Sequence, residues 1–125
     1  MKAIGEKHWI IPDGYIPPAS SGSLESHESV CVLNTSDRDV HLRFTDYFED
    51  REPLENMTYV VPARRTKHIR TSALAADGRS IPAGVPYAME VVSDVPVIVQ
   101  YSRLDSTQAE NALMSIVPYA VRTEE

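Results

Sequence analysis

The spacing of proline and glycine limits this chain to short secondary-structure elements. Nine prolines and five glycines are spread along 125 residues, and the segments between them are apolar or alternating runs. Such spacing is typical of many short strands and leaves little room for a long helix. Residues 40–48 give the clearest pattern, because Val40, Leu42 and Phe44 alternate with more polar side chains, as in a strand with one buried face.

The chain is predicted to form an all-β fold, an antiparallel β-sandwich of about eight short strands with little helix. Its 125 residues suit a single domain, which we expect to span residues 1–125. One helical turn is expected within residues 71–78, capped by Thr71 or Ser72 and stopped by Gly78. Pro118 predicts an edge position for the last strand. The expected strands cover residues 7–11, 28–34, 40–48, 57–61, 64–70, 87–92, 97–101 and 112–119.

The sequence also supports specific predictions for two residues within these strands, Asp46 and Cys31. Asp46 falls on the apolar face of residues 40–48, so we expect either a β-bulge there or a buried, hydrogen-bonded carboxylate. Cys31 is the only cysteine, which excludes an intrachain disulfide. It lies in the apolar run 30–33 and is expected to be a small buried hydrophobic residue and not a reactive thiol.

A basic run at residues 61–70 stands out in an otherwise acidic chain. It carries four of the twelve Lys and Arg residues, whereas the chain as a whole has a net charge of −6. A solvated strand face would explain it, since like charges about 7 Å apart in water repel by only roughly 0.6 kcal/mol. We favour a role in binding an anionic counterpart or in subunit assembly. The candidate contact residues are Arg64, Arg65, Lys67, His68 and Arg70.

Two further groups of polar and aromatic residues are candidates for recognition. The first follows the most apolar strand and comprises Arg103, Asp105, Gln108, Glu110 and Asn111; its alternative role is a salt-bridged turn. The second would line a carbohydrate pocket and comprises Trp9, Tyr15, His27 and Glu28. Trp9 is the sole tryptophan, and core packing is the alternative for its side chain.

The sequence contains none of the common short motifs for metal binding, nucleophilic catalysis or nucleotide binding. The four histidines are far apart and form no metal-binding spacing, so no metal site is expected. No Gly-x-Ser-x-Gly elbow, Gly-x-x-x-x-Gly-Lys loop or Gly-x-Gly-x-x-Gly loop occurs. We therefore expect a protein that is not an enzyme and uses no cofactor. No stretch approaches the roughly 18 apolar residues of a membrane span, and a cytoplasmic location is expected.

Several blocks of this sequence resemble the Anabaena sensory rhodopsin transducer family. They are Trp9, DGYIPP at 13–18, SHESVCVLN at 26–34, VPARRTKHIR at 61–70 and RLDSTQAENAL at 103–113. The resemblance implies a small soluble β-sandwich protein that forms a homotetramer. For the founding member it implies contact with the cytoplasmic face of a sensory rhodopsin and a suggested link to DNA, and for other relatives the binding of sugars or other small ligands.

The function expected from residues and resemblance together is signal transduction or ligand binding by a homo-oligomer. Its partner would be a membrane sensory protein, met at the cytoplasmic face, or an anionic or sugar small molecule. Two alternatives stay open: a carbohydrate- or small-molecule-binding protein of sugar metabolism, and a DNA-linked regulator that uses the basic run. The acidic net charge argues against binding nucleic acid through the whole surface.

Overall fold

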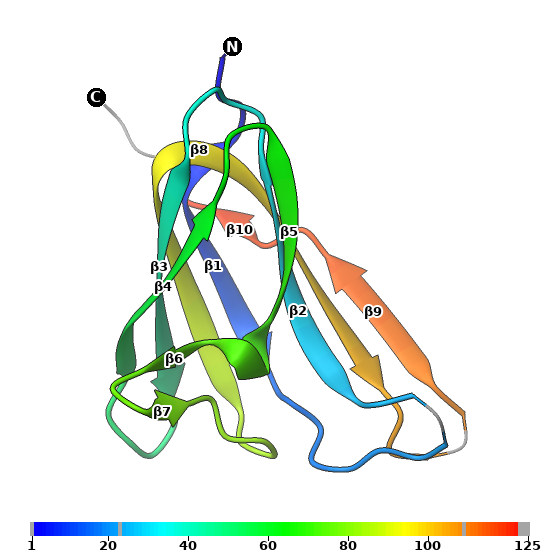
Figure 1. Cartoon of the computed structure of the whole chain (residues 1–125). Coiled ribbons are helices and arrows are strands. Elements are labelled where there is room, and N and C mark those ends of the chain that lie inside the picture. Colours follow the sequence, from blue (N-terminus) through cyan, green and yellow to red (C-terminus); the bar gives the residue numbers. More distant parts are fainter. Residues whose placement is uncertain (1, 23, 109, 123–125) are drawn as a thin grey trace.

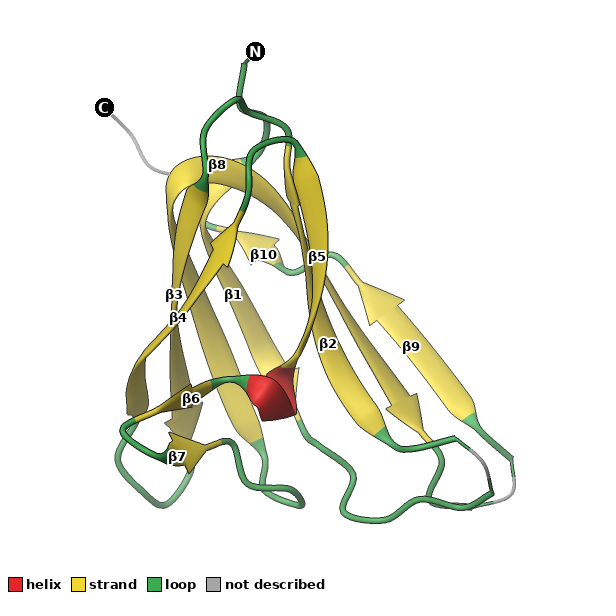
Figure 2. Ribbon diagram, in the orientation of Figure 1, coloured by secondary structure: helices red, strands yellow, loops and turns green. Residues whose placement is uncertain are grey.

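The computed structural model describes residues 2–22, 24–108 and 110–122. These residues form ten antiparallel strands and one short 3-10 turn, so the predicted all-β class is confirmed (Figure 2). The elements are β1 (Glu6–Gly14), β2 (His27–Asn34), β3 (Val40–Phe48), β4 (Leu54–Val61), β5 (Arg65–Arg70), η1 (Thr71–Ala73), β6 (Ala75–Ala76), β7 (Arg79–Ser80), β8 (Tyr87–Asp105), β9 (Ala112–Ile116) and β10 (Tyr119–Ala120).

Eight of the described strands are hydrogen-bonded into one continuous antiparallel sheet that folds over into two layers (Figure 1). In the first layer the strand order is β4-β3-β8-β1-β10. In the second layer it is β5-β2-β8-β9. The two layers share β8, which runs through both. The side chains between them form the core, in which Val30, Phe44, Met57 and Val97 are fully buried.

The long strand β8 corrects the prediction of two separate strands at 87–92 and 97–101. It continues for 19 residues and changes layers near Pro96, because its first part pairs with β3 and its later part with β2. Proline has no backbone N–H to donate, which suits the corner where a strand leaves one layer for the other. Gly5 meets this corner with φ +119, and a Cβ there would lie 1.9 Å from the Val97 carbonyl oxygen. Only glycine permits that approach.

The expected helical turn is confirmed in position but not in its capping. η1 begins after Arg70, which occupies the N-cap position without a side-chain hydrogen bond, and Thr71 lies inside the turn. Gly78 does not stop a helix. It lies with Asp77 at positive φ, 75° and 53°, in the two-residue turn that joins β6 to β7. An Asp-Gly pair is a strong signal for this hairpin turn.

The last predicted strand, 112–119, is divided in the structure. β9 pairs with β8 in the second layer, whereas β10 pairs with β1 in the first. Pro118 lies between them and is buried. β9 has β8 as its only partner among the described strands, so the predicted edge position is confirmed. The described residues include no helix long and apolar enough to span a membrane.

Candidate functional site

A buried polar network centred on Glu28 occupies the space between the two layers. Glu28 is only 1% exposed, on β2. Its Oε1 accepts a hydrogen bond from the Tyr87 hydroxyl at 2.5 Å. Its Oε2 accepts hydrogen bonds from the Tyr15 backbone N–H at 2.6 Å and from the Tyr101 hydroxyl. The carboxylate therefore ties the chain after β1 to the long strand β8.

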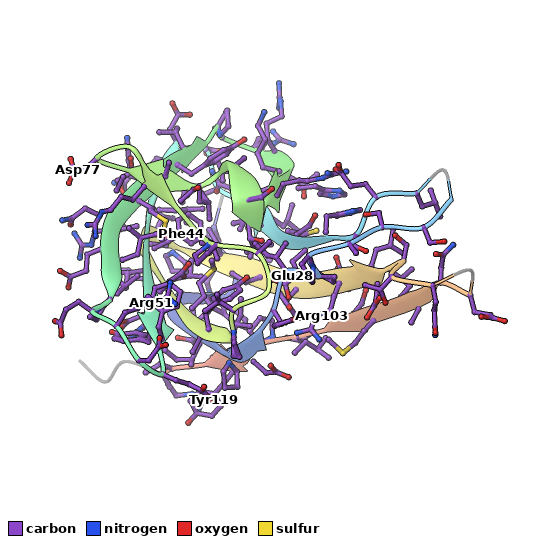
Figure 3. The ribbon with its side chains drawn as sticks, turned by 90° about the horizontal axis from the view of Figure 1, so that it is seen from below. Glu28, Phe44, Arg51, Asp77, Arg103 and Tyr119 are labelled. Atoms are coloured by element: carbon purple, nitrogen blue, oxygen red, sulfur yellow. The ribbon has the colours of Figure 1, made fainter. Side chains whose placement is uncertain are left out.

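Arg103 completes this network from β8. It lies opposite Glu28 in the β2–β8 register, and its Nε donates to Glu28 Oε2 at 3.0 Å. Its guanidinium also donates to the Tyr101 hydroxyl at 3.2 Å and to the Asp13 carbonyl oxygen at 3.4 Å. Glu28 and Arg103 lie close together in Figure 3. The sequence placed these two residues in different candidate sites, and the structure brings them into one.

The chemistry of the Glu28 network is structural. Burial, and then the charge of Glu28, raise the pKa of the Tyr87 hydroxyl well above its usual range. Burial and the hydrogen bond to Glu28 raise the pKa of the Tyr101 hydroxyl in the same way. Both phenols therefore stay neutral donors. Because Glu28 is buried and has four donors around it, it cannot contact a ligand that arrives from solvent.

Asp46 is a second buried carboxylate between the layers. The β3–β4 register shifts between Phe44 and Asp46, which confirms the expected bulge. The expected hydrogen bond is missing: Asp46 is 0% exposed, and neither carboxylate oxygen has a partner among the described residues. Burial, followed by repulsion from Glu28, raises the pKa of Asp46 to about 8. The side chain is thus held in the neutral form near pH 7.

The basic run forms strand β5 as predicted, apart from Arg64. Arg64 precedes the strand in a turn with φ 56°, and its N–H donates to the Ser36 carbonyl oxygen at 3.0 Å. Arg65 bonds to nearby backbone carbonyl oxygens at 3.1 and 3.4 Å. Arg70 pairs with Glu25 at 2.8 Å, with both side chains exposed. Arg64 and Arg65 are left as exposed cations at one end of the strand.

The two faces of β5 differ in burial. Ile69 is buried and Lys67 half-buried on the inner side. On the outer side, His68 lies opposite Cys31 of β2. The side chain of Cys31 is half-buried, which corrects the expectation that it lies in the core, and burial raises the pKa of its thiol. A small cavity of about 250 Å³ on this outer face is lined by Cys31, Leu33, Thr66, His68, Ile98 and Gln100.

The candidate polar residues from Asp105 onward form a turn followed by exposed side chains. Asp105 accepts hydrogen bonds from the Thr107 N–H at 3.0 Å and the Thr107 hydroxyl at 2.7 Å, which lower the pKa of its carboxyl. The alternative offered by the sequence, a salt-bridged turn, is therefore right about the turn but not about what holds it, because Arg103 pairs with Glu28 and Asp13. Gln108, Glu110 and Asn111 are exposed beyond it. Residue 109, inside the resembling block 103–113, lies outside the described residues.

The residues expected to line a carbohydrate pocket do not present a common open surface. Trp9 is 5% exposed and its indole N–H donates to the Glu6 carbonyl oxygen at 3.0 Å. Glu28 is buried in the network, and Tyr15 reaches it through the backbone. His27, which directly precedes Glu28 in the chain, contacts the Glu25 carbonyl oxygen through its ring Nδ1 at 2.8 Å. Trp9 therefore follows the core-packing alternative.

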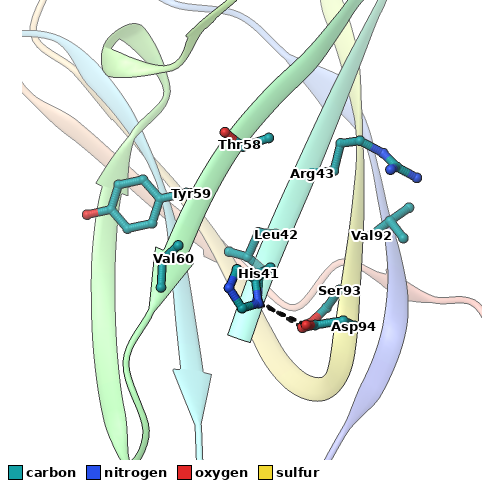
Figure 4. Close-up of a pocket in the computed structure, with 9 residues that line it drawn as sticks. All are labelled: His41, Leu42, Arg43, Thr58, Tyr59, Val60, Val92, Ser93 and Asp94. Atoms are coloured by element: carbon teal, nitrogen blue, oxygen red, sulfur yellow. Dashed lines mark hydrogen bonds and ion pairs between the residues drawn. The ribbon is translucent and has the colours of Figure 1, made fainter. Parts of the chain in front are cut away.

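A cavity that the sequence did not indicate lies on the outer face of β3, β4 and β8 (Figure 4). Its volume of about 560 Å³ falls in the range of small-molecule sites. At its rim, Asp94 accepts from the His41 N–H at 2.8 Å and contacts His41 Nδ1 at 2.9 Å. Burial raises the pKa of Asp94, but these hydrogen bonds outweigh it and lower the pKa overall. The lining residues are His41, Leu42, Arg43, Thr58, Tyr59, Val60, Val92, Ser93 and Asp94.

The C-terminal segment exposes large apolar side chains. They lie on β9, after it and on β10. β9 belongs to the second layer, beside the end of β8 and away from β3 and β4 (Figure 1). The exposed fractions are 75% for Leu113, 39% for Met114, 40% for Ile116, 70% for Val117 and 70% for Tyr119. These exposed apolar residues follow one another along the chain, and on β9 they lie on both faces of the strand.

Comparison with known proteins decides the family. The model of the family Anabaena sensory rhodopsin transducer matches residues 4–120. The chain belongs to this family. No curated protein sequence matches it. Among the described residues, no group of three or more His, Cys, Asp or Glu side chains is placed to hold a metal ion.

Two solved structures show how far the similarity to this family extends. A crystal structure of Thermotoga maritima 1070 is 37% identical, with a TM-score of 0.82, and the match covers 94% of this chain and 96% of that one. A structure of the Anabaena sensory rhodopsin transducer is 42% identical, with a TM-score of 0.73, and the match covers 81% of this chain and 97% of that one. The resemblance drawn from the sequence blocks is thereby confirmed.

Proposed function

We propose that this chain is a non-enzymatic transducer module that acts as a homo-oligomer and binds a signalling partner. Membership of the sensory rhodopsin transducer family supports the transducer role. The Glu28 network argues against catalysis by these residues, because its polar groups are buried and hydrogen-bonded to each other. A homotetramer is the assembly that the resemblance implies.

The main observation in support of the proposed homo-oligomer is the exposed apolar surface of the C-terminal segment. Leu113, Val117 and Tyr119 are each at least 70% exposed. Such side chains lower the free energy of an assembly that removes them from water, by about 25 cal/mol for each Å² buried. A second copy of the chain supplies an identical apolar surface, so that both copies gain from the contact.

Charge placed on this surface tests the proposal. The double variant Leu113→Glu/Val117→Glu is expected to dissociate the assembly, because two carboxylates per chain would have to be buried without partners. Sedimentation velocity should show a smaller mass for the variant than for the native chain. Val60→Glu is the matched control, since Val60 is an exposed apolar residue on β4, at 47%. A double variant that keeps the native mass would contradict the proposed surface.

We propose that the partner is a membrane sensory protein, met at its cytoplasmic face by the exposed cations before and at the start of β5. Arg64 and Arg65 are exposed in a chain of net charge −6, which supports contact with an acidic surface. Binding to a sensory rhodopsin held in nanodiscs should weaken with added salt. Arg64→Ala/Arg65→Ala should weaken it roughly tenfold, about 1.4 kcal/mol, and Arg51→Ala should not. Affinity that is independent of salt would remove this electrostatic contact.

A small anionic or sugar ligand is the second candidate for what the module binds. The outer-face cavity of Figure 4 favours it, because its volume of about 560 Å³ suits such a ligand and Arg43, His41 and Thr58 provide polar groups beside apolar Val60.

A further inference from the structure

The outer-face cavity of Figure 4 is lined by aliphatic side chains with polar ones between them. In the register of the sheet, Arg43 of β3 lies between Val92 of β8 and Thr58 of β4. In the neighbouring row, His41 lies beside Val60 of β4. Val60 is 47% exposed, so its methyl groups are open to a molecule that enters the cavity. A ligand held here would contact apolar and polar groups at the same time.

Arg43 is a cation whose hydrogen-bond donors are free. Its side chain is exposed, and within the described part of the chain its guanidinium forms no hydrogen bond and no ion pair. The nearby Glu90 is already satisfied, because its Oε1 accepts from the Tyr47 hydroxyl at 2.6 Å and its Oε2 contacts His8 Nε2 at 2.6 Å. The Tyr47 hydrogen bond lowers the pKa of Glu90, and Arg43 adds to this effect through its charge alone. The guanidinium therefore keeps its planar fork of N–H donors for a ligand.

His41, the other basic residue of the cavity, is held by an acid. Asp94 accepts from the His41 backbone N–H at 2.8 Å and lies 2.9 Å from its Nδ1. An ionised carboxylate can only accept, so Nδ1 carries the proton of this hydrogen bond. When the ring gains a second proton, Asp94 lies beside it and balances the charge. Arg43 is thus the one basic lining residue that is not hydrogen-bonded to an acid.

The acids near Arg43 limit a ligand to one negative charge. Glu90 and Asp94 lie on β8, two residues to either side of Val92, the residue paired with Arg43. A second negative charge on the ligand would be repelled by one of these carboxylates. A phosphate ester, with a charge of about −1.5 to −2 at pH 7, is disfavoured for this reason. A carboxylate carries a single charge, and its two oxygens match the guanidinium fork.

We propose that the outer-face cavity binds an aliphatic monocarboxylate of medium chain length, with its carboxylate on Arg43 and its hydrocarbon chain against Val60 and Val92. This rests on the second candidate of the proposed function and narrows that candidate, a small anionic or sugar ligand, to one chemical class. A neutral sugar would make no use of the charge on Arg43 and would place hydroxyl groups against valine side chains, where they lack hydrogen-bond partners.

Titration of hexanoate into the nitrogen-15-labelled native chain, followed by NMR, tests this proposal. The backbone amide signals of residues 41–43, 58–60 and 92–94 should shift until they saturate. Butyrate should bind more weakly, by up to about fourfold for each CH₂ lost, which corresponds to ~0.8 kcal/mol each. Hexanamide has the same length without the charge, and adipate adds a second charge. Each should bind roughly tenfold more weakly than hexanoate.

Two arginine variants separate the proposed contact from general charge. Arg43→Gln should weaken hexanoate binding roughly tenfold and leave hexanamide binding unchanged. Arg79→Gln is the matched control, because Arg79 is an exposed arginine on β7 and does not line this cavity. It should bind hexanoate as the native chain does. The spectra without ligand show whether either variant keeps the native fold.

The possible outcomes distinguish this inference from the proposed function. Hexanoate that leaves the cavity signals unshifted, or that shifts only the C-terminal segment, overturns the proposed ligand class. Equal binding of hexanoate and hexanamide, or native affinity in Arg43→Gln, also overturns it. Glucose that shifts the cavity signals where hexanoate does not would overturn the carboxylate and leave the small-ligand candidate standing. A cavity that responds to neither compound overturns both, whereas the transducer role is tested by the salt dependence of partner binding.

Discussion

Replacing Glu28 with glutamine is expected to lower the free energy of unfolding by about 3–5 kcal/mol, the cost of breaking a buried ion pair by removing one partner. The glutamine Nε2 cannot accept the hydrogen bonds that Arg103 and Tyr101 now donate to Oε2. The half-buried guanidinium of Arg103 would also lose the charge that faces it. Urea unfolding monitored by circular dichroism, at one fixed protein concentration, measures the change.

Glu25→Gln is the control for the Glu28 prediction. Glu25 also pairs with an arginine, Arg70, but its side chain is 74% exposed. Exposed ion pairs of this kind contribute only about 0–1 kcal/mol. We therefore expect little change from Glu25→Gln. Equal effects of the two substitutions would show that the buried network does not hold the layers together.

Asp46→Asn is expected to remove a strong pH dependence of stability. The pKa of Asp46 is raised from 3.8 to about 8 in the folded chain. Between these values the folded state keeps a proton that the unfolded state has lost, so stability falls as pH rises, by about 1.4 kcal/mol per pH unit. Relative to the native chain, the variant should gain roughly 4 kcal/mol between pH 4.5 and 8.

Unfolding at a series of pH values measures this difference. The quantity compared is the free energy of unfolding of the variant minus that of the native chain at each pH. This subtraction removes the contributions of other carboxyls, such as Asp94, whose pKa is lowered and which therefore stabilise the fold as pH rises. Asp50→Asn is the matched control, because Asp50 is 72% exposed, and it should retain the native pH dependence. A parallel pH dependence for Asp46→Asn and the native chain would show that Asp46 is not buried as described.

The parts of the fold that follow local patterns were predictable from the sequence. Alternation gave the bounds of β3, residues 40–48, as the structure has them. Joining 87–92 and 97–101 into β8 was not predictable, because Pro96 is an ordinary strand breaker unless the strand turns a corner there. The β6–β7 hairpin did carry a local signal, Asp77-Gly78, which the expectation of a helix stop overlooked.

The Glu28 network could not be assembled from sequence spacing. Glu28 and Arg103 are 75 residues apart and meet only because β2 pairs with β8 in one particular register. Strand alternation does place His41 and Arg43 on the outward face of β3. The contact of His41 with Asp94, however, again depends on which strand lies beside β3. Local alternation therefore predicts which face of a strand a residue occupies, whereas the contacts between residues of different strands depend on the pairing of those strands.

The mass of the native chain in solution tests most directly whether its exposed apolar C-terminal segment is covered by other copies. Sedimentation velocity over a range of micromolar concentrations should give a single species with the mass of four chains of 13.9 kDa. A species of 13.9 kDa at every concentration would contradict the account. Leu113, Val117 and Tyr119 would then remain in contact with water, and the proposed homo-oligomer could not be maintained.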